Sequence, residues 1–395
     1  MALGFSGLAM MGLQFALTAR FRRVKAPYGS DIVCFFHRQI SLVTFLIASH
    51  PLILFITSLD TLELLNVIAA PWRARAGVTA LLALIALIAI SLWRKNFRIH
   101  YDEWRMWYGI LATAALAMAH IVGVGHYVGT PWKRALWIAY GTFWVGLLVY
   151  VRIIKPWMEL RRPYRVEQVI QERGNAWTLA LRPDGHAGLP FSPGQFAWLT
   201  IWDSPFSDRE HPFSFFSSAV HSERLSFTIK ELGDFTTRIK QVTPDQVVYL
   251  EGPHGAFSID RHPDAPGYVF IAGGVGITPM MSALRTLADR EGERPLLLMY
   301  ANKTWEAVTF REEIERLQER PNLRVVHVLE QAPPDWAGET GFVNAEILKR
   351  YLLENRADCE HFICGPEPMM NAVEKTLHQL GVPFARFHSE RFNLV

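Results

Sequence analysis

Histidines lie inside two apolar stretches near the start of the chain. His37 and His50 bound the stretch HRQISLVTFLIASH, which carries no charge after its arginine, and His120 lies within residues 106–127. Ionisable side chains are costly inside a bilayer and mark functional positions there. Neutral imidazoles from two helices form a suitable axial pair for haem iron. We therefore expect His50 and His120 to ligate haem; the alternative for each histidine is a hydrogen bond between helices.

The spacing of the histidines decides which of them can meet. The two runs cross the membrane in the same direction, so His50 and His120 are expected at similar depth. His37 lies about 20 Å from His50 along the helix, a separation that suits a second haem. No histidine of the second run is level with His37, because His100 is about 30 Å from His120, and Tyr108 occupies that level instead. The second haem is therefore absent, ligated by His37 alone, or completed by an unusual partner.

Five apolar runs approach the length of about 20 helical residues that a membrane span needs. They are residues 2–19, 32–58, 76–93, 106–127 and 135–151. So many runs in the first 150 residues argue against the alternative, buried helices of a large soluble protein. Lysines and arginines concentrate after the first, third and fifth runs, which places these loops in the cytoplasm. The sequence predicts a multi-pass plasma (inner) membrane protein whose N-terminus is outside and whose C-terminal part is cytoplasmic.

After the last run the pattern becomes that of a soluble protein. Segments such as YRVEQVIQE, WTLALRP and VVYLEGP, bounded by turn residues, predict a small antiparallel β-barrel. From Gly267, strands alternate with helices, which predicts a parallel sheet covered by helices. We expect three domains: a membrane α-helical bundle at 1–156, a β-barrel domain at 160–262 and an α/β nucleotide-binding domain at 263–395.

The α/β part carries glycines where a phosphate would bind. In IAGGVGITPMM, Gly273, Gly274 and Gly276 let the backbone approach a phosphate, and the following helix supplies N–H groups. The stretch is not the GxGxxG fingerprint, because Pro279 occupies the last position. Ligands of such sheets bind at the carboxyl ends of the strands. A second strand end, FICGPEPMM, is expected to bring further residues to this edge: Cys364, Gly365 and Pro366.

Two stretches of the barrel part, EHPFSFFSS and KELGDFTTRI, combine charged, aromatic and hydroxyl side chains. Gly233, Thr236 and Thr237 stand at an expected helix start, which is a second candidate anion site. The alternative for each stretch is ordinary strand and capping chemistry.

Charge and cysteine content exclude several other classes. The net charge is +3 and the basic residues are scattered, so no nucleic-acid partner is expected. The three cysteines form no CxxC, which excludes a zinc ribbon and a plant-type iron–sulfur cluster. A disulfide framework is also excluded, and the second half is expected in a reducing compartment.

Together these residues resemble the ferric reductase / NADPH oxidase superfamily, in which a haem-bearing transmembrane domain is fused to a ferredoxin–NADP reductase-like FAD/NAD(P)H module. The resemblance covers nearly the whole chain, and its motifs occur in the expected order. It implies that the barrel binds FAD and that the α/β part binds NAD(P)H. The residues assigned to FAD are His211, Pro212, Phe213, Ser214, Lys230, Gly233, Thr236 and Thr237. Those assigned to the nicotinamide nucleotide are Gly273, Gly274, Gly276, Thr278, Pro279, Cys364, Gly365 and Pro366.

The C-terminal tail ERFNLV is similar to the family's tail, whose aromatic residue, here Phe392, lies against the flavin ring. Phe392 and Cys364 are therefore the expected catalytic residues. The segment YANKTW has no acid to accept a ribose 2′-hydroxyl, and Lys303 could meet a 2′-phosphate, which favours NADPH over NADH.

The chain departs from the family in two ways. Members have six spans, and this sequence shows five. Members also carry two histidines on each ligand helix, and here Tyr108 replaces one of the four. The resemblance thus implies one or two haems b, with His50, His120 and His37 as the metal ligands.

The expected function is electron transfer from NAD(P)H through FAD and membrane haem to a small acceptor such as oxygen, a ferric chelate or a quinone. A second hypothesis is a membrane-anchored NAD(P)H–flavin reductase with one haem that reduces a quinone or a partner protein. A third is a haem-binding scaffold or sensor without turnover.

Overall fold

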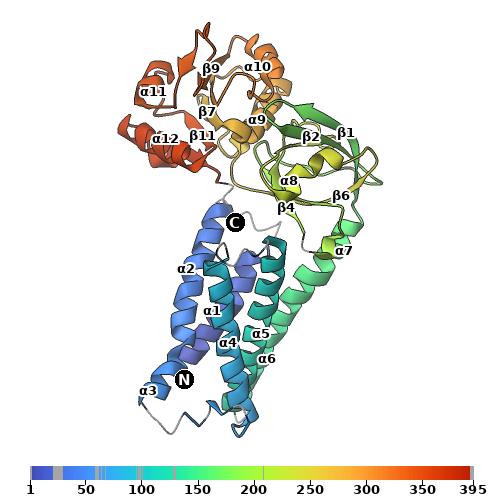
Figure 1. The fold of residues 1–395 in the computed structure, drawn as a ribbon, viewed down its shortest axis with the longest axis vertical. Coiled ribbons are helices and arrows are strands. Elements are labelled where there is room, and N and C mark those ends of the chain that lie inside the picture. The colour runs from blue at the N-terminus through green and yellow to red at the C-terminus, as the bar shows by residue number, and fades with distance from the viewer. Residues whose placement is uncertain are drawn as a thin grey trace.

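A bundle of helices forms one end of the molecule and two sheet-containing parts form the other (Figure 1). The computed structural model describes residues 2–20, 30–57, 62–63, 65–66, 68–94, 96, 99, 101–127, 130–207 and 209–391. The bundle helices are α1 (Ala2–Thr18), α2 (Ser30–Ala48), α3 (His50–Thr57), α4 (Trp72–Leu92), α5 (Tyr101–Tyr127) and α6 (Pro131–Val149).

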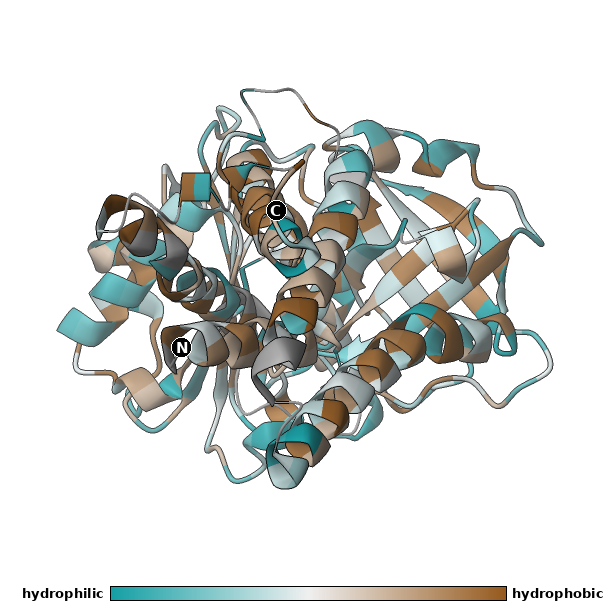
Figure 2. Cartoon of the chain, turned by 90° about the horizontal axis from the view of Figure 1, so that it is seen from below, coloured by the Kyte–Doolittle hydropathy of each residue, from teal (hydrophilic) through white to brown (hydrophobic). Residues whose placement is uncertain are grey.

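A continuous helical rod joins the bundle to the rest of the molecule. One π-helical turn, η2 (Tyr150–Ile154), follows α6 and leads directly into α7 (Lys155–Leu160), which reaches the β-barrel (Figure 1). Helices of the bundle are largely apolar (Figure 2), and large side chains such as Leu82, Leu136 and Phe143 are exposed. Exposed apolar side chains around a helix indicate a surface that contacts lipid.

Among the described residues, three helical segments are long and apolar enough to cross a membrane: Trp72–Leu92, Glu103–Gly123 and Pro131–Leu160. They correspond to the third, fourth and fifth predicted runs. The prediction of about five spans is not confirmed, because the first two runs supply only the shorter apolar helices Leu3–Thr18 and Phe35–Ala48 among the described residues.

The second predicted run, residues 32–58, is divided rather than continuous. Helix α2 ends at Ala48, and α3 begins at His50. Pro51 has no backbone N–H to donate to the carbonyl of Ile47, so an unbroken α-helix loses a hydrogen bond there. His50 consequently lies at a helix start.

The barrel contains six antiparallel strands in the order β4-β3-β6-β1-β2-β5. A bridge between Phe215 and Phe227 joins the two edges. Alternate residues of the strands point inward to an apolar core that includes Val166, Leu199 and Phe227. The strands are β1 (Tyr164–Glu172), β2 (Ala176–Pro183), β3 (Phe196–Ile201), β4 (His211–Ser214), β5 (Leu225–Lys230) and β6 (Val247–His254).

The last part is a parallel sheet in the order β10-β9-β8-β7-β11-β12. Both faces are buried: Phe270 of β7 packs into one core and Ile271 into the other. The strands are β7 (Tyr268–Gly273), β8 (Leu296–Asn302), β9 (Leu323–Leu329), β10 (Glu339–Thr340), β11 (Glu360–Cys364) and β12 (Phe387–Ser389). The main helices are α9 (Thr278–Asp289), α10 (Arg311–Gln318), α11 (Ala345–Tyr351) and α12 (Glu367–Gln379).

Candidate functional site

The two predicted nicotinamide segments meet at the carboxyl edge of the parallel sheet. A Cβ on Gly276 would lie 2.3 Å from the carbonyl oxygen of Cys364, and a Cβ on Gly273 would lie 2.7 Å from the ring of Pro366. Gly274 has a φ of +55°, in the left-handed region that favours glycine. The glycines therefore allow the turn after β7 to approach the end of β11, as the sequence predicts.

This edge also lies beside the barrel. A Cβ on Gly274 would be 4.0 Å from Nζ of Lys230, the last residue of β5. Thr278 and Pro279 are buried in the first turn of α9, where the Thr278 hydroxyl donates to the carbonyl of Val275. The structure thus brings together residues predicted to bind the nicotinamide nucleotide and a residue predicted to bind the flavin phosphates.

The two predicted flavin segments also pack together. The His211 ring on β4 stacks on Phe235, with a centroid distance of 3.8 Å, and Phe213 lies 6.1 Å from the same ring. Phe235 belongs to α8 (Asp234–Thr237), a helix of one turn. Pro212 follows His211 in β4, and Ser214 ends that strand with a buried side chain.

The two threonines of α8 are engaged within that turn. The Thr236 hydroxyl accepts hydrogen bonds from the backbone N–H groups of Leu232 and Gly233, at 2.8 and 2.9 Å. The Thr237 hydroxyl donates to the carbonyl of Asp234. Their contact with a flavin phosphate stays a prediction.

The expected catalytic residues have different outcomes. Cys364 is buried at the end of β11, and burial raises the pKa of its thiol well above the usual value, with Glu390 adding to the shift. Phe392 lies outside the described residues. Lys303 directly follows β8 and is exposed at the edge of the sheet.

Within the bundle, His50 has a defined ring orientation. Its Nδ1 lies 3.0 Å from the carbonyl oxygen of Ile47, which can only accept, so Nδ1 donates this hydrogen bond and, in the neutral ring, Nε2 keeps its lone pair. The ring lies against Gly4 of α1, where a Cβ would be 3.2 Å from Cε1. This tautomer leaves Nε2 available to ligate a metal.

His120 lies among aromatic residues of α6. Its ring stacks on Trp137 with a centroid distance of 4.5 Å and an interplanar angle of 8°. A Cβ on Gly141 would lie 3.0 Å from Nε2 of His120. Trp137 also packs edge-on against Phe5, the neighbour of Gly4, at 5.8 Å. A chain of contacts therefore connects the surroundings of His50 and His120.

These surroundings fit haem ligation by His50 and His120. Both are imidazoles in an apolar and aromatic environment, and both rings lie against glycines where any larger residue would intrude. Neutral imidazoles of this kind are suitable haem ligands.

His37 has a different environment. Its Nε2 lies 2.9 Å from the hydroxyl oxygen of Tyr108, as two helices bring them together. The sequence placed Tyr108 level with His37, and the structure makes them a hydrogen-bonded pair. Iron ligation through this nitrogen would require the hydrogen bond to break.

A charged network that the sequence analysis did not predict joins the bundle to the barrel. Arg20, which follows α1, forms an ion pair with Glu210, and Nη2 of Arg105 on α5 lies 2.5 Å from the same carboxylate. Glu210 immediately precedes the HPFS segment of β4. The guanidinium of Arg20 also lies over the ring of Trp198 on β3, 4.3 Å from its centroid.

A second carboxylate extends this network. Glu251 on β6 is 1% exposed and contacts Nη1 of Arg20 at 2.9 Å, Nζ of Lys155 at 3.0 Å and Nε2 of His254 at 2.6 Å. Burial alone would raise the pKa of the Glu210 carboxyl group. The positive charges of Arg20 and Arg105 outweigh this effect and lower the pKa to about 2. Glu210 is therefore ionised at neutral pH, and the network holds β4 and β6 against the helix ends.

Three protein families match the sequence. Residues 3–119 match the ferric reductase like transmembrane component, residues 171–266 match an FAD-binding domain, and residues 270–375 match the oxidoreductase NAD-binding domain.

Relatives and solved structures agree with these matches. The glycine betaine monooxygenase reductase subunit of Chromohalobacter salexigens is 30% identical over 60% of this chain and 65% of its own length. NADH-cytochrome b5 reductase 1 of Aspergillus terreus is 35% identical over 52% of this chain and 72% of its own length. The FAD/NAD-binding domain of nitric oxide dioxygenase from Vibrio cholerae superposes with a TM-score of 0.51 at 25% identity, over 58% of this chain and 97% of that domain. The chain spans 50–65% of the length of the first relatives found.

The fold and the site define a flavin- and nicotinamide-binding reductase module fused to a membrane helix bundle. The chain belongs to the ferric reductase / NADPH oxidase superfamily.

Proposed function

We propose that this chain is a transmembrane oxidoreductase that passes electrons from NAD(P)H through FAD and a membrane haem to an acceptor such as oxygen or ferric iron. The observation that carries the proposal is the charged network of Arg20, Arg105 and Glu210. It holds the strand with the flavin motif against the ends of the membrane helices. In this arrangement residues 1–156 are the haem domain, 160–262 the FAD domain and 263–395 the NAD(P)H domain.

Each group of residues has a role in this proposal. The backbone around Gly276 and Gly365 receives the nicotinamide nucleotide, and Lys303 receives a 2′-phosphate. His211 and Lys230 hold FAD, while His50 and His120 hold haem b. FAD, when bound, converts the two electrons of a hydride into the single electrons that haem iron accepts. The module lies on the cytoplasmic face of the plasma membrane.

The hydrogen bond between His37 and Tyr108 favours a second candidate function. In this alternative the chain holds one haem and delivers electrons to a quinone or a partner protein. Two relatives are named as the reductase subunits of a glycine betaine monooxygenase and of a stachydrine N-demethylase, which supports a protein partner.

The decisive experiment uses the full chain purified in detergent after expression with added haem. NADPH or NADH is added without oxygen, and the visible spectrum is recorded. Reduction of the haem bands supports the transmembrane pathway. If the protein oxidises NAD(P)H with an artificial dye as the electron acceptor while its haem stays oxidised, the second candidate function is favoured. If it oxidises no NAD(P)H, both candidate functions are contradicted.

A further inference from the structure

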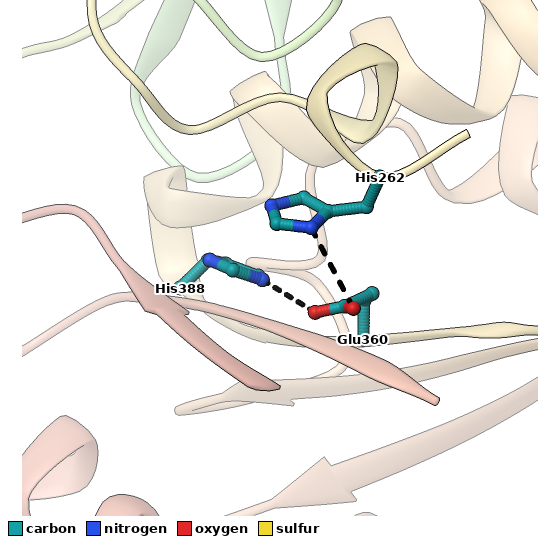
Figure 3. A group of neighbouring side chains, drawn as sticks. All are labelled: His262, Glu360 and His388. Atoms are coloured by element: carbon teal, nitrogen blue, oxygen red, sulfur yellow. Dashed lines mark hydrogen bonds and ion pairs between the residues drawn. The ribbon is translucent and has the colours of Figure 1, made fainter. Parts of the chain in front are cut away.

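Two histidines and a glutamate form a compact cluster at the side of the parallel sheet (Figure 3). Glu360 begins β11, whereas Cys364 of the nicotinamide edge ends it. Ligand atoms of His262, Glu360 and His388 all lie within 4.8 Å of one another. None of the three residues has a role in the proposed electron pathway.

Strand register places two of these side chains together. Strands β11 and β12 are parallel, and His388 pairs with Phe362. Residues two apart in a strand point to the same face, so Glu360 and Phe362 share the face to which His388 also points. The ring of His388 packs on Phe362 with a centroid distance of 4.8 Å.

The third side chain comes from the segment that joins the barrel to the sheet. His262 follows the turn η5 (Ile259–Arg261), and its carbonyl accepts a hydrogen bond from the Tyr268 hydroxyl at 2.9 Å. Its ring lies 4.1 Å from that of His388, centroid to centroid. Both rings point toward the carboxylate (Figure 3).

The distances approach those of a metal site. Nε2 of His388 is 2.6 Å from one carboxylate oxygen of Glu360, and Nδ1 of His262 is 3.5 Å from the other. Bonds of 2.0–2.2 Å in a tetrahedral zinc site place ligand atoms about 3.3–3.5 Å apart. Small side-chain rotations would therefore admit an ion. Glu360 is only 2% exposed, which gives the site a fixed anionic ligand.

We propose that His262, Glu360 and His388 bind a divalent transition metal of the zinc class, with water as the fourth ligand. Two imidazoles and one carboxylate suit zinc better than magnesium or calcium, which prefer oxygen ligands. The bound ion would fix the edge strand β12 to the segment before β7. It would thereby anchor the last strand of the chain.

Arg386 is the competitor for the carboxylate. It forms an ion pair with Glu360, but its side chain is 39% exposed. The guanidinium can therefore turn toward solvent when a metal ion supplies the positive charge.

The test uses the full-length protein, stripped with a chelator and dialysed against zinc chloride. Elemental mass spectrometry, which distinguishes zinc from haem iron, should detect one zinc per chain. The extended X-ray absorption fine structure at zinc should show two imidazole ligands. His262→Gln and His388→Gln should each weaken zinc binding by at least about 100-fold, because even outer partners of metal ligands contribute 10–100-fold.

The matched control is His221→Gln. His221 lies 3.5 Å from Glu223 and 3.7 Å from Asp289 but belongs to no three-ligand cluster among the described residues. Its substitution should leave zinc binding unchanged. The proposal would be overturned if the unmodified protein retained less than one zinc per chain. It would also be overturned if both histidine variants kept their flavin and bound zinc as tightly as the unmodified protein.

A second measurement tests the anchoring role. Zinc should slow hydrogen exchange of the β12 amides in the unmodified protein and have no effect in His388→Gln. Equal protection with and without zinc in the unmodified protein would contradict the anchoring role.

Discussion

At the scale of single residues, glycines determine where the membrane histidines can lie. A Cβ on Gly141 would lie 3.0 Å from Nε2 of His120, and a Cβ on Gly4 would lie 3.2 Å from Cε1 of His50. Contacts near 3.0 Å are tighter than packed side chains tolerate without movement. The positions of the two imidazoles thus depend on residues that have no side chain.

We predict that Gly141→Ala displaces the His120 ring and weakens haem binding. Overpacking of this kind costs about 1–3 kcal/mol. Gly146→Ala on the same helix is the matched control, because nothing in the described part of the chain lies within 4 Å of its Cβ position. Haem titration of both variants measures the difference. Equal haem affinity in both would show that Gly141 does not shape the site.

A second residue-scale prediction separates one haem from two. His120→Ala should remove haem, whereas His37→Ala and Tyr108→Phe should leave one haem per chain, because the Nε2 of His37 is engaged by the Tyr108 hydroxyl. The pyridine haemochrome assay gives haem per chain for each variant. Loss of half the haem in His37→Ala would instead establish a second site.

At the scale of elements, the bundle and the barrel are joined by partly buried charges: the side chains of Arg20, Arg105 and Glu210 are 25%, 20% and 11% exposed. Removing one partner of a fully buried ion pair destabilises by about 3–5 kcal/mol, and a partly buried pair contributes less. Glu210→Gln leaves Arg20 and Arg105 without their shared carboxylate. We predict that this variant still reduces an artificial dye with NAD(P)H but reduces its own haem more slowly.

Stopped-flow spectroscopy of the flavin and haem bands measures the two steps separately. The control is Glu312→Gln, because Glu312 also contacts two arginines, Arg173 at 2.5 Å and Arg311 at 3.6 Å, but lies at an exposed site. Solvent-exposed ion pairs contribute little to the stability of a folded protein. A haem reduction rate that is the same in both variants would argue against the docking role of Glu210.

The same network predicts a pH dependence. The pKa of Glu210 is lowered from 4.5 to about 2 by Arg20 and Arg105 against the opposing effect of burial. A carboxyl group whose pKa is lower in the folded than in the unfolded state stabilises the folded state at pH values above its unfolded-state pKa. This stabilisation is lost as the pH falls toward the folded-state pKa. The contribution of Glu210 to the docking of the barrel on the bundle should be constant from pH 5 to 8 and should weaken from about pH 4.5 downward.

Protease cleavage near α7 as a function of pH would report this loosening. Glu210→Gln should remove the part of the pH dependence that this carboxylate supplies. An unchanged profile in the variant would assign the transition to other groups, with Glu251 as the first candidate.

The sequence predicted some of these elements and could not predict others. The alternating run YRVEQVIQE became β1, because its period of two residues is a local property. The break at Ser49 was missed, because the apolar run outweighed the signal of Pro51. The pair of Arg20 with Glu210 was also missed, since it joins residues 190 positions apart and no local pattern encodes such a contact.

At the scale of the whole molecule, the start of α1 lies at the end of the bundle away from the sheets (Figure 1). The lysines and arginines after the first, third and fifth apolar runs predict that the opposite end lies in the cytoplasm. We predict that a reporter fused before α1 is active outside the cytoplasm and that one fused after β12 is active inside. Activity of both reporters on one side would contradict this orientation.

The uninterrupted rod of α6, η2 and α7 has a mechanical consequence. Each residue of an α-helix advances the chain by about 100° around its axis. The π-helical turn Tyr150–Ile154 accommodates one additional residue within this shaft. Deleting one residue from an α-helical part of the rod would therefore rotate the reductase module by about 100° and move Glu210 and Glu251 away from the arginines of the bundle, whereas a deletion within the π-helical turn would only restore a regular α-helix.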